Sequence, residues 1–509
     1  MNSTTAPLND WIAYRARNSP LRTALVVSTR TWNYAELDAD VTRTARQLAQ
    51  LGVGSGDRVA MLLHNGPFVA LLAHATLRLG ATLVPLNLRL TAAEIAWQVG
   101  DCGALLLIVE ERTVATSDAA RQRHSALSTI SIDNAGAAML HNSALGRQPE
   151  ADVPLRLAHD PASVLAIIYT SGTTGLPKGA MLTVGNFWWS AIGSALNLGT
   201  RDDDRWLACM PLFHVGGLSI LLRSAIYGTA AIIHDAFDAA EVNAAIDDDG
   251  VTIVSVVAVM LQRMLDARDD RRYPAALRCV LLGGGPAPRP LLERCARLGI
   301  PVVQSYGLTE TTSQLATLAP EDALRKIGTA GRPIYPNELR TVIEGHDAAV
   351  GEPGEIVVRG PVVMRGYAGH SDTTARAIVD GWLHTGDVGT LDADGYLTVL
   401  DRRDDLIITG GENVYPAEVE ATLLSHPWVV EAGVVGVPHP EWGQSVVAFV
   451  RLTDAPDVKI ADAADQLRAY CRARLAGYKI PRDVRIANEP LPRTASGKLR
   501  RNVLRDRAQ

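Results

Sequence analysis

The chain has 509 residues, of which 47% are hydrophobic and 20% charged, as in an ordinary soluble globular protein. This length exceeds what one hydrophobic core usually supports, so we expect at least two domains. The net charge of −6 argues against a nucleic-acid-binding protein, which would show a basic balance. The five cysteines are scattered without CxxC spacing, which argues against a zinc site or a disulfide framework and is typical of a reducing cytosol.

The first residues, "MNSTTAPLNDWIAYRARNSP", lack the basic region and apolar run of a secretory signal. Apolar stretches such as "TIVSVVAVML" are far shorter than the roughly 20 residues that a membrane-spanning helix needs. We therefore expect a cytoplasmic protein.

Up to about residue 340, short β-branched runs alternate with longer helical patterns. The runs include "ALLLIVE", "SVLAIIYTS", "AAIIHD", "TIVSVV" and "LRCVLLGGG". Buried strands separated by helices predict parallel, doubly wound α/β sheets. The segment "GDRVAMLLHNGPFVALLAHATLRLGATLVPLN" is predicted to form one strand–helix–strand unit.

After about residue 350 the pattern changes to short strands with tight turns, including a hairpin at Asp394-Gly395. A compact α+β pattern follows Arg403, with a helix that begins at Pro416 and strands at "VVEAGVVGV" and "SVVAFVRL". We expect an N-terminal α/β domain over residues 1–403, with doubly wound sheets and a small β subdomain. A small mobile α+β domain is expected over residues 404–509.

The stretch "TSGTTGLPKG" follows a buried strand and has the composition of a phosphate-binding loop. Its glycines let backbone N–H groups turn toward an anion, while hydroxyl groups and one lysine add donors. It is not a Walker A loop, because Pro177 and Gly179 stand where that motif, counted from Gly172, needs glycine and Ser or Thr. An ordinary polar loop is the alternative interpretation.

Two further stretches follow apolar runs. In "LLGGGPAP", glycines 283–285 permit a flat ligand to approach the backbone, although a plain strand-to-helix turn has the same pattern. In "QSYGLTET", Tyr306 beside Gly307 suits a purine base, and Glu310 can bind Mg²⁺ through oxygen. A lone tyrosine is also compatible with core packing. In open α/β sheets, ligands gather at the carboxyl ends of strands, where these loops fall.

Near the C-terminus, three residues have the chemistry of ligand-binding groups. Asp387 in "GWLHTGD" can accept from both hydroxyls of a ribose, and Arg402 in "DRRDD" can donate to them. A surface ion pair is the alternative for this pair. Lys498 lies in "PRTASGKLRR", which by charge pattern alone resembles a solvated basic tail.

In this order and spacing, the five stretches resemble the adenylate-forming superfamily of acyl-CoA synthetases, adenylation domains and luciferases, from about residue 10 to 505. The resemblance implies that the first loop holds the phosphates of ATP, and that "YGLTE" binds adenine and Mg²⁺ with Glu310 as the metal-associated acid. The implied ATP-binding residues are Thr170, Ser171, Gly172, Thr173, Thr174, Gly175, Lys178, Gly284, Gly285, Ser305, Tyr306, Gly307, Thr309, Asp387 and Arg402.

The resemblance also implies a reaction in two steps. A carboxylate first attacks the α-phosphorus of ATP and expels pyrophosphate, and Lys498, not Lys178, contacts the reacting oxygens. The small domain then rotates about Asp404, and the thiol of coenzyme A displaces AMP. The loop "TGGENVYP" is implied to line the pantetheine tunnel, with room provided by Gly410 and Gly411.

The acid itself is predicted from similarity to bacterial 2-succinylbenzoate–CoA ligases of menaquinone biosynthesis, seen in "PLFHVGGLSILLRSAIYG" and "GNFWWSAIGSALNLG". His214 then lies near the reacting carboxylate and joins Lys498 and Glu310 as a catalytic residue. Arg223 is a candidate partner for the second carboxylate, although we favour a helix-surface arginine. The predicted acyl-binding residues are His214, Ser219, Gly283 and Thr312.

Alternatives remain open at this point. Val184 stands where many relatives carry histidine, so the acid can differ, as in a fatty-acid or aryl-acid CoA ligase. A stand-alone adenylation enzyme would load a carrier protein, but no carrier "GxxS" segment follows Lys498 and the "GGEN" loop favours free CoA. A nucleotide-binding protein without activity would not need all four of Glu310, Asp387, Arg402 and Lys498. The expected partners are a small carboxylic acid, ATP and CoA, with homo-oligomerisation left open.

Overall fold

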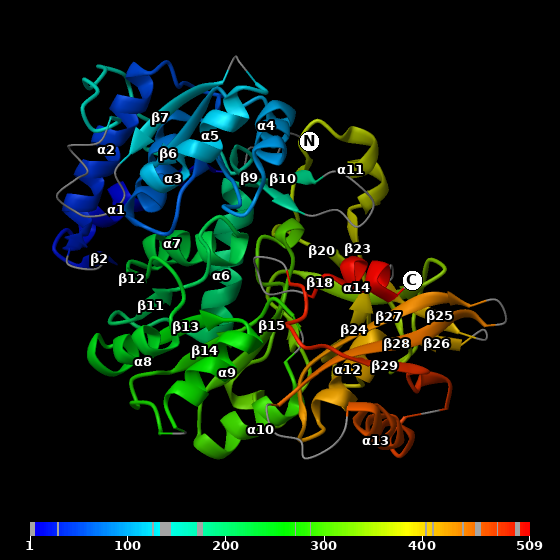
Figure 1. The fold of residues 1–509 in the computed structure, drawn as a ribbon. Helices are drawn as coiled ribbons and strands as arrows, with labels where there is room; N and C mark the ends of the chain where they lie inside the picture. The colour runs from blue at the N-terminus through cyan, green and yellow to red at the C-terminus, as the bar shows by residue number, and fades with distance from the viewer. Residues whose placement is uncertain are drawn as a thin grey trace.

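A computed structural model of the protein describes residues 6–27, 30–124, 127–132, 144–170, 177–269, 271–285, 287–402, 405–409, 412–439, 442–453, 460–475, 477–493 and 499–508. Within those ranges, no helix combines the length and the apolar character needed to cross a membrane. Two large sheets form the N-terminal part, and a smaller sheet and a separate small domain lie to one side (Figure 1).

The first sheet has the strand order β21-β10-β9-β5-β4-β6-β7. The predicted strand–helix–strand unit is confirmed, because β4 and β5 pair in parallel and α3 (Pro67–Leu79) connects them. Pro67 occupies the first turn of α3, and Gly80 ends the helix in the left-handed region. The strands are β4 (Arg58–Leu62), β5 (Thr82–Pro85), β6 (Leu106–Glu110), β7 (Ser128–Ile132), β9 (Val164–Thr170), β10 (Lys178–Thr183) and β21 (Gly366–Tyr367).

The second sheet has the order β17-β16-β15-β14-β13-β11-β12-β2-β3 and is parallel from β15 to β2. Its strands are β2 (Thr23–Val27), β3 (Arg30–Asn33), β11 (Arg205–Ala208), β12 (Ala230–Ile233), β13 (Ile253–Val256), β14 (Cys279–Leu282), β15 (Val302–Tyr306), β16 (Ala316–Thr317) and β17 (Arg332–Pro333). All five apolar runs that predicted buried strands form strands of these two sheets.

The edges of both sheets differ from the predicted parallel arrangement. β10 pairs antiparallel with β9, and β16 pairs antiparallel with β15. A parallel pair needs a crossover of about a dozen residues or more, and only residues 171–177 separate β9 from β10. The predicted phosphate loop therefore connects two antiparallel strands and does not lead directly into a helix.

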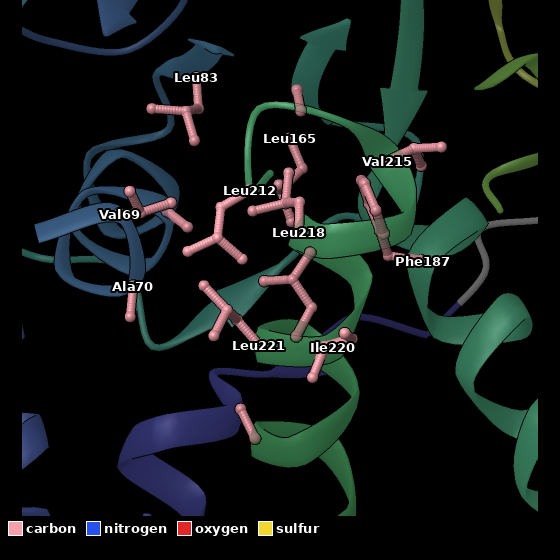
Figure 2. Close-up of a cluster of buried hydrophobic side chains, with 14 of the residues drawn as sticks. Val69, Ala70, Leu83, Leu165, Phe187, Leu212, Val215, Leu218, Ile220 and Leu221 are labelled. Carbon is pink, nitrogen blue, oxygen red and sulfur yellow. The ribbon is translucent and has the colours of Figure 1, made fainter. Parts of the chain in front are cut away.

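Helices of the two large sheets meet in a shared core. Every residue of α3 is buried, as expected for a helix that is apolar on all sides. Side chains of α3 and α7 (Val215–Tyr227) pack together with Leu83 of β5, Leu165 of β9 and Phe187 of α6 (Figure 2). The other helices are α1 (Trp11–Asn18), α2 (Tyr34–Gln50), α4 (Ala92–Cys102), α5 (Val114–Arg121), α6 (Val184–Leu198), α8 (Ala239–Asp248), α9 (Ala258–Ala267), α10 (Arg289–Leu298) and α11 (Ser371–Ala377).

The predicted β subdomain is the sheet β19-β18-β20-β23-β22, to which β24 adds beside β23. The hairpin at Asp394-Gly395 is confirmed, since it joins the antiparallel strands β23 and β24 and Gly395 has φ +79°. The strands are β18 (Glu338–Ile343), β19 (His346–Asp347), β20 (Gly354–Arg359), β22 (Ile378–Val379), β23 (Trp382–Leu391) and β24 (Leu397–Arg402).

The C-terminal residues form a separate sheet with its own core, shown in orange and red in Figure 1. Pro416 is the first residue of α12, as predicted. The elements are β25 (Ile407–Thr409), β26 (Glu412–Val414), α12 (Pro416–Leu424), β27 (Val429–His439), β28 (Gly443–Leu452), α13 (Ile460–Arg472), β29 (Asp483–Ile486) and α14 (Arg501–Ala508). The predicted boundary residue Asp404 lies outside the described residues.

A buried ion cluster ties the N-terminal helices together. Arg78 on α3 is 1% exposed and donates to Asp10 from Nε at 3.1 Å and from Nη2 at 2.9 Å. Asp10 also caps α1 by accepting from the backbone N–H of Ala13 at 2.8 Å, and Nε2 of His159 lies 3.2 Å from its other oxygen. Arg78 bonds Asp38 of α2 as well. The cluster compensates a guanidinium that would otherwise be costly to bury.

The buried side chain of His74, one turn before Arg78 on α3, is expected to make the stability of the protein depend on pH. Burial lowers the pKa of His74 to about 4, although the charge of Asp10 opposes this shift. In the unfolded chain the group titrates near 6.5, so the unfolded state binds more protons between pH 6.5 and 4. We expect the free energy of unfolding to fall over this range by on the order of 3 kcal/mol from His74 alone. Thermal melts of the protein and of His74→Phe test this, since the variant should lose less stability on acidification. Equal pH dependence of the two proteins would contradict the assignment.

Candidate functional site

The turn after β15 requires a glycine. A Cβ added at Gly307 would lie 1.6 Å from the carbonyl oxygen of Ser313, so no side chain fits there. The chain folds back at this point, since the backbone N–H of Leu315 donates to the carbonyl of Tyr306 at 2.9 Å, and the short helix Thr309–Thr311 lies between these residues in the chain. The predicted residues Ser305, Tyr306, Thr309 and Glu310 all belong to this turn.

Tyr306 and Asp387 are in direct contact. The hydroxyl of Tyr306 donates to Oδ2 of Asp387 at 2.7 Å, across 81 residues of sequence. Asp387 is 5% exposed and lies directly opposite Arg402 in the pairing of β23 with β24. The structure describes only the backbone of Arg402. It therefore brings the two predicted ribose-binding positions together beside the predicted adenine-binding tyrosine.

Glu310 lies beside one end of the predicted phosphate loop, and its partner Tyr367 lies near the other end. Its Oε1 accepts from the hydroxyl of Tyr367 at 2.9 Å and lies 3.5 Å from the hydroxyl of Thr170. Nζ of Lys178 lies 5.7 Å from the ring centroid of Tyr367. Residues 171–175, which include Ser171, Gly172, Thr173, Thr174 and Gly175, lie outside the described residues. Sequence reasoning missed Tyr367, although its position beside Gly366 resembles the Tyr306-Gly307 pair.

The oxygens at Glu310 suit a hard cation. A carboxylate and the hydroxyl of Thr170 are oxygen ligands of the type that Mg²⁺ prefers. Among the described residues, no group of three or more His, Cys, Asp or Glu side chains could hold a metal ion. These residues therefore fit an Mg²⁺ ion that takes further oxygen ligands from a phosphate-bearing molecule.

A glycine-lined strip lies beside Tyr306. β14 and β15 are neighbouring parallel strands, so residues 283–285 and 305–307 meet at the same edge of the sheet. A Cβ at Gly283 would approach only the backbone oxygen of Ser305, at 3.4 Å, and one at Gly285 would meet nothing within 4 Å. Gly284 has φ +79°, which favours glycine. The strip leaves room for a flat ligand against the backbone.

The predicted acyl-binding residues lie along α7. His214 precedes the first residue of this helix, and its ring centroid lies 4.5 Å from that of Phe213. Ser219 and Arg223 are one turn apart and share a face, with exposures of 1% and 2%. The prediction that Arg223 is a helix-surface arginine is therefore wrong, because α6 covers this face of α7.

Arg223 is buried without a carboxylate partner among the described residues. Its Nη2 donates to the hydroxyl of Ser190 at 2.9 Å, and the ring centroid of Trp206 lies 5.8 Å from its guanidinium carbon. Nε has no hydrogen-bond partner there, and burial lowers the pKa of the group. A buried, uncompensated cation is costly, so the site favours an anionic ligand.

A series of hydrogen bonds leads from Arg223 through Ser190 to Thr312. The hydroxyl of Ser190 donates to the carbonyl of Thr312 at 2.7 Å, and the hydroxyl of Thr312 donates to the carbonyl of Val362 at 2.8 Å. The hydroxyl of Thr312 is thus engaged within the protein. Gln314 is 3% exposed, and neither of its amide atoms has a partner among the described residues. No sequence pattern pointed to Gln314.

Four predicted residues of the small domain lie outside the described residues: Asp404, Gly410, Gly411 and Lys498. The residues that flank the two glycines, Thr409 and Glu412, are partners in the pairing of β25 with β26. The roles predicted for these residues stay predictions.

Comparison with known proteins identifies close relatives. The family model described as AMP-binding enzyme matches residues 12–368, and the AMP-binding enzyme C-terminal domain matches residues 418–498. A 2-succinylbenzoate–CoA ligase from Geobacillus kaustophilus is 51% identical over 504 residues, which cover 99% of this chain and 98% of the relative.

Solved structures of one Bacillus subtilis enzyme are also similar. Its o-succinylbenzoate CoA synthetase, in complex with the acyl-adenylate intermediate OSB-AMP, has a TM-score of 0.90 at 41% identity and covers 99% of both chains. The same synthetase in complex with ATP and magnesium ion has a TM-score of 0.89 at 41% identity, covering 97% of this chain and 99% of the other.

Replacement of Gly307 tests the geometry of the turn. We expect Gly307→Ala to weaken ATP binding by about tenfold to a hundredfold, because the turn must open to relieve the overlap with Ser313. Calorimetric titration with ATP measures the effect, and circular dichroism checks that the fold is kept. Gly54→Ala is a matched control, since its Cβ would meet only a carboxylate oxygen at 3.7 Å. Unchanged ATP affinity in Gly307→Ala would show that the turn does not shape the site.

Proposed function

The chain belongs to the AMP-binding enzyme family, and from this premise we propose that it is an ATP-dependent 2-succinylbenzoate–CoA ligase. Full-length identity of 51% to a ligase of that specificity supports the substrate and the predicted superfamily. In this chain, the observation that carries the proposal is the buried, uncompensated guanidinium of Arg223, which suits a dicarboxylate. We place the reaction in menaquinone biosynthesis and the protein in the cytoplasm.

In the first step, a carboxylate oxygen of the acid attacks the α-phosphorus of ATP. A new bond between this oxygen and phosphorus forms, the bond from phosphorus to the oxygen that bridges to the β-phosphate breaks, and pyrophosphate leaves with the electron pair. Mg²⁺, held by Glu310 and Thr170, supplies positive charge against the charge that develops on the phosphates. Residues 170–178 steady the phosphates, and Asp387 accepts from the ribose hydroxyls.

Adenine fits between the ring of Tyr306 and the glycine-lined strip at 283–285. The hydrogen bond to Asp387 fixes the tyrosine hydroxyl, so the ring keeps one orientation at the edge of the sheet. His214, at the beginning of α7, lies where the acid enters from the α6–α7 side. These groups orient the reactants, which accounts for a large part of the rate in such transfers.

In the second step, the thiolate sulfur of coenzyme A attacks the carbonyl carbon of the acyl adenylate and AMP leaves. We assign Lys498 to the first step and Gly410 and Gly411 to the passage of the thiol arm. The small domain, residues 404–509, turns about Asp404 between the steps. Its separate core supports this assignment, because a domain with its own core moves as one body.

Arg223 explains why a dicarboxylate is preferred. A fatty acid would leave Nε of Arg223, the Ser219 hydroxyl and the Gln314 amide without hydrogen-bond partners among the described residues. A second carboxylate pairs with the guanidinium through charge-assisted hydrogen bonds. Sites built to bond a polar substrate group reject analogues that lack it more strongly than apolar pockets do.

An assay of pyrophosphate release over a panel of acids tests the substrate. We expect 2-succinylbenzoate to outcompete benzoate and octanoate, and mass spectrometry to detect the CoA thioester without any carrier protein. Arg223→Met should lower kcat/KM for 2-succinylbenzoate by about a hundredfold and leave that for benzoate nearly unchanged. Equal loss with both acids, or preference for octanoate in the unmodified protein, would contradict the proposal.

Lys498→Ala separates the two steps. The variant should lose adenylation, because the positive charge beside the reacting oxygens is removed, and should still form thioester from supplied acyl adenylate and CoA. Lys479→Ala is the control: this lysine of the same domain bonds Glu418 at 2.8 Å and should change neither step. Full adenylation by Lys498→Ala would refute the assignment.

A further inference from the structure

The residues on either side of segment 494–498 are held by carboxylates of other elements. On the N-terminal side, Glu431 of β27 accepts from the backbone N–H of Leu491 at 3.3 Å and from Nε of Arg493 at 3.4 Å. Arg493 and Leu499 pair with each other as an antiparallel bridge. The ends of the segment that contains Lys498 are therefore brought together and attached to β27.

On the C-terminal side, Arg501 begins α14 and forms a fork with Glu420 of α12. Its Nε and Nη2 donate to the two carboxylate oxygens at 3.2 and 2.8 Å, and Nη1 donates to Oδ2 of Asp405 at 3.2 Å. The Arg501 and Glu420 side chains are only 15% and 10% exposed. Glu420 also accepts from the backbone N–H of Val434 at 2.8 Å. Bidentate pairs of this kind are strong and fix geometry.

Arg501 and its partner Asp405 each lie close in sequence to a residue with a proposed role. Asp405 directly follows the proposed hinge residue Asp404, and Arg501 is three residues after Lys498. One guanidinium thus joins Asp405, at the start of the small domain, to the helix that follows the lysine. Close packing also attaches α14 and Leu499 to β27, since a Cβ on Gly433 would lie 2.6 Å from Leu504 and 2.8 Å from Leu499.

We propose that Arg501 is a positioning residue for the adenylation step: by bonding Asp405 and Glu420, it fixes the start of α14, three residues after Lys498, relative to the residue that follows the proposed hinge. The inference rests on the proposed roles of Lys498 and Asp404. Placement within about 1 Å matters for the adenylation step, where a misplaced group can cost a hundredfold in rate. Thioester formation does not use Lys498, so it should not depend on this link.

A purely structural role is the competing explanation, and the chain offers a matched control for it. Arg485 of β29 anchors the other end of α14 by donating to the carbonyls of Arg507 and Ala508 at 2.8 and 3.1 Å. It pairs with Asp483 and, among the described residues, makes no bond to Asp405. If anchoring α14 were all that mattered, Arg485→Met would act like Arg501→Met.

The experiment compares Asp405→Asn, Arg501→Met and Arg485→Met in the full-length protein. Pyrophosphate release with ATP and 2-succinylbenzoate reports adenylation, and thioester formation from synthetic acyl adenylate and CoA reports the second step. We expect Asp405→Asn and Arg501→Met to slow adenylation by about tenfold and to leave thioester formation nearly unchanged. Arg485→Met should leave both steps nearly unchanged.

Asp405→Asn keeps the Arg501–Glu420 fork intact, so it is informative even if Arg501→Met disturbs folding. Because Asp405 also pairs with Arg505 at 3.6 Å, Arg505→Met is measured beside it, and slowing of adenylation in Arg505→Met equal to that in Asp405→Asn would overturn the assignment to Arg501. Equal slowing of both steps in Asp405→Asn, or no slowing of either, would overturn the inference. The outcome is also separable from the proposed function. If Lys498→Ala loses adenylation and Asp405→Asn does not, only the positioning role of Arg501 is refuted. If Lys498→Ala keeps adenylation, the assignment of Lys498 is refuted, and so is the positioning role of Arg501 that rests on it.

Discussion

Two carboxylates, Glu310 and Asp387, are each held by a tyrosine hydroxyl from another element, and the geometry of the site depends on these two hydrogen bonds. Tyr367 of β21 donates to Glu310 at 2.9 Å, and Tyr306 of β15 donates to Asp387 at 2.7 Å. The strands β21, β15 and β23 belong to three different sheets. A hydrogen bond to a charged group contributes about 1.5–3 kcal/mol. The two bonds therefore hold the edges of three sheets in one arrangement, at which a nucleotide can contact all of them.

Two buried arginines of this protein have opposite electrostatic environments. Arg78 is surrounded by Asp10 and Asp38, so its charge is compensated within the protein and helps to hold α1, α2 and α3 together. Arg223 is equally buried, but among the described residues the hydroxyl of Ser190 is its only hydrogen-bond partner. The first arrangement stabilises the fold and needs no ligand to compensate the charge. The second leaves a charge that an anionic ligand can compensate, which is how a binding site differs from a structural ion pair.

The small domain has its own hydrophobic core. Its core residues, such as Val434 and Leu467, pack with each other and not with the large sheets. The carboxylates Glu431 and Glu420 attach the flanks of segment 494–498 to this core from two sides. The proposed rotation of this domain between the two steps needs such a body, because the groups that it carries must keep their relative positions.

The sequence by itself determined the family and the inner strands of both large sheets, and it predicted the phosphate-loop, adenine and ribose motifs. These features depend on residues that are close in sequence, such as the β-branched runs, the Asp394-Gly395 turn and the proline that begins α12. The tertiary structure alone decided that Tyr367 contacts Glu310 across 57 residues and that Arg223 is buried. From the sequence, Arg223 is predicted to lie on the helix surface, because arginine side chains are mostly exposed. Its true environment depends on α6, which covers that face, and no local pattern in either helix specifies how the two helices pack.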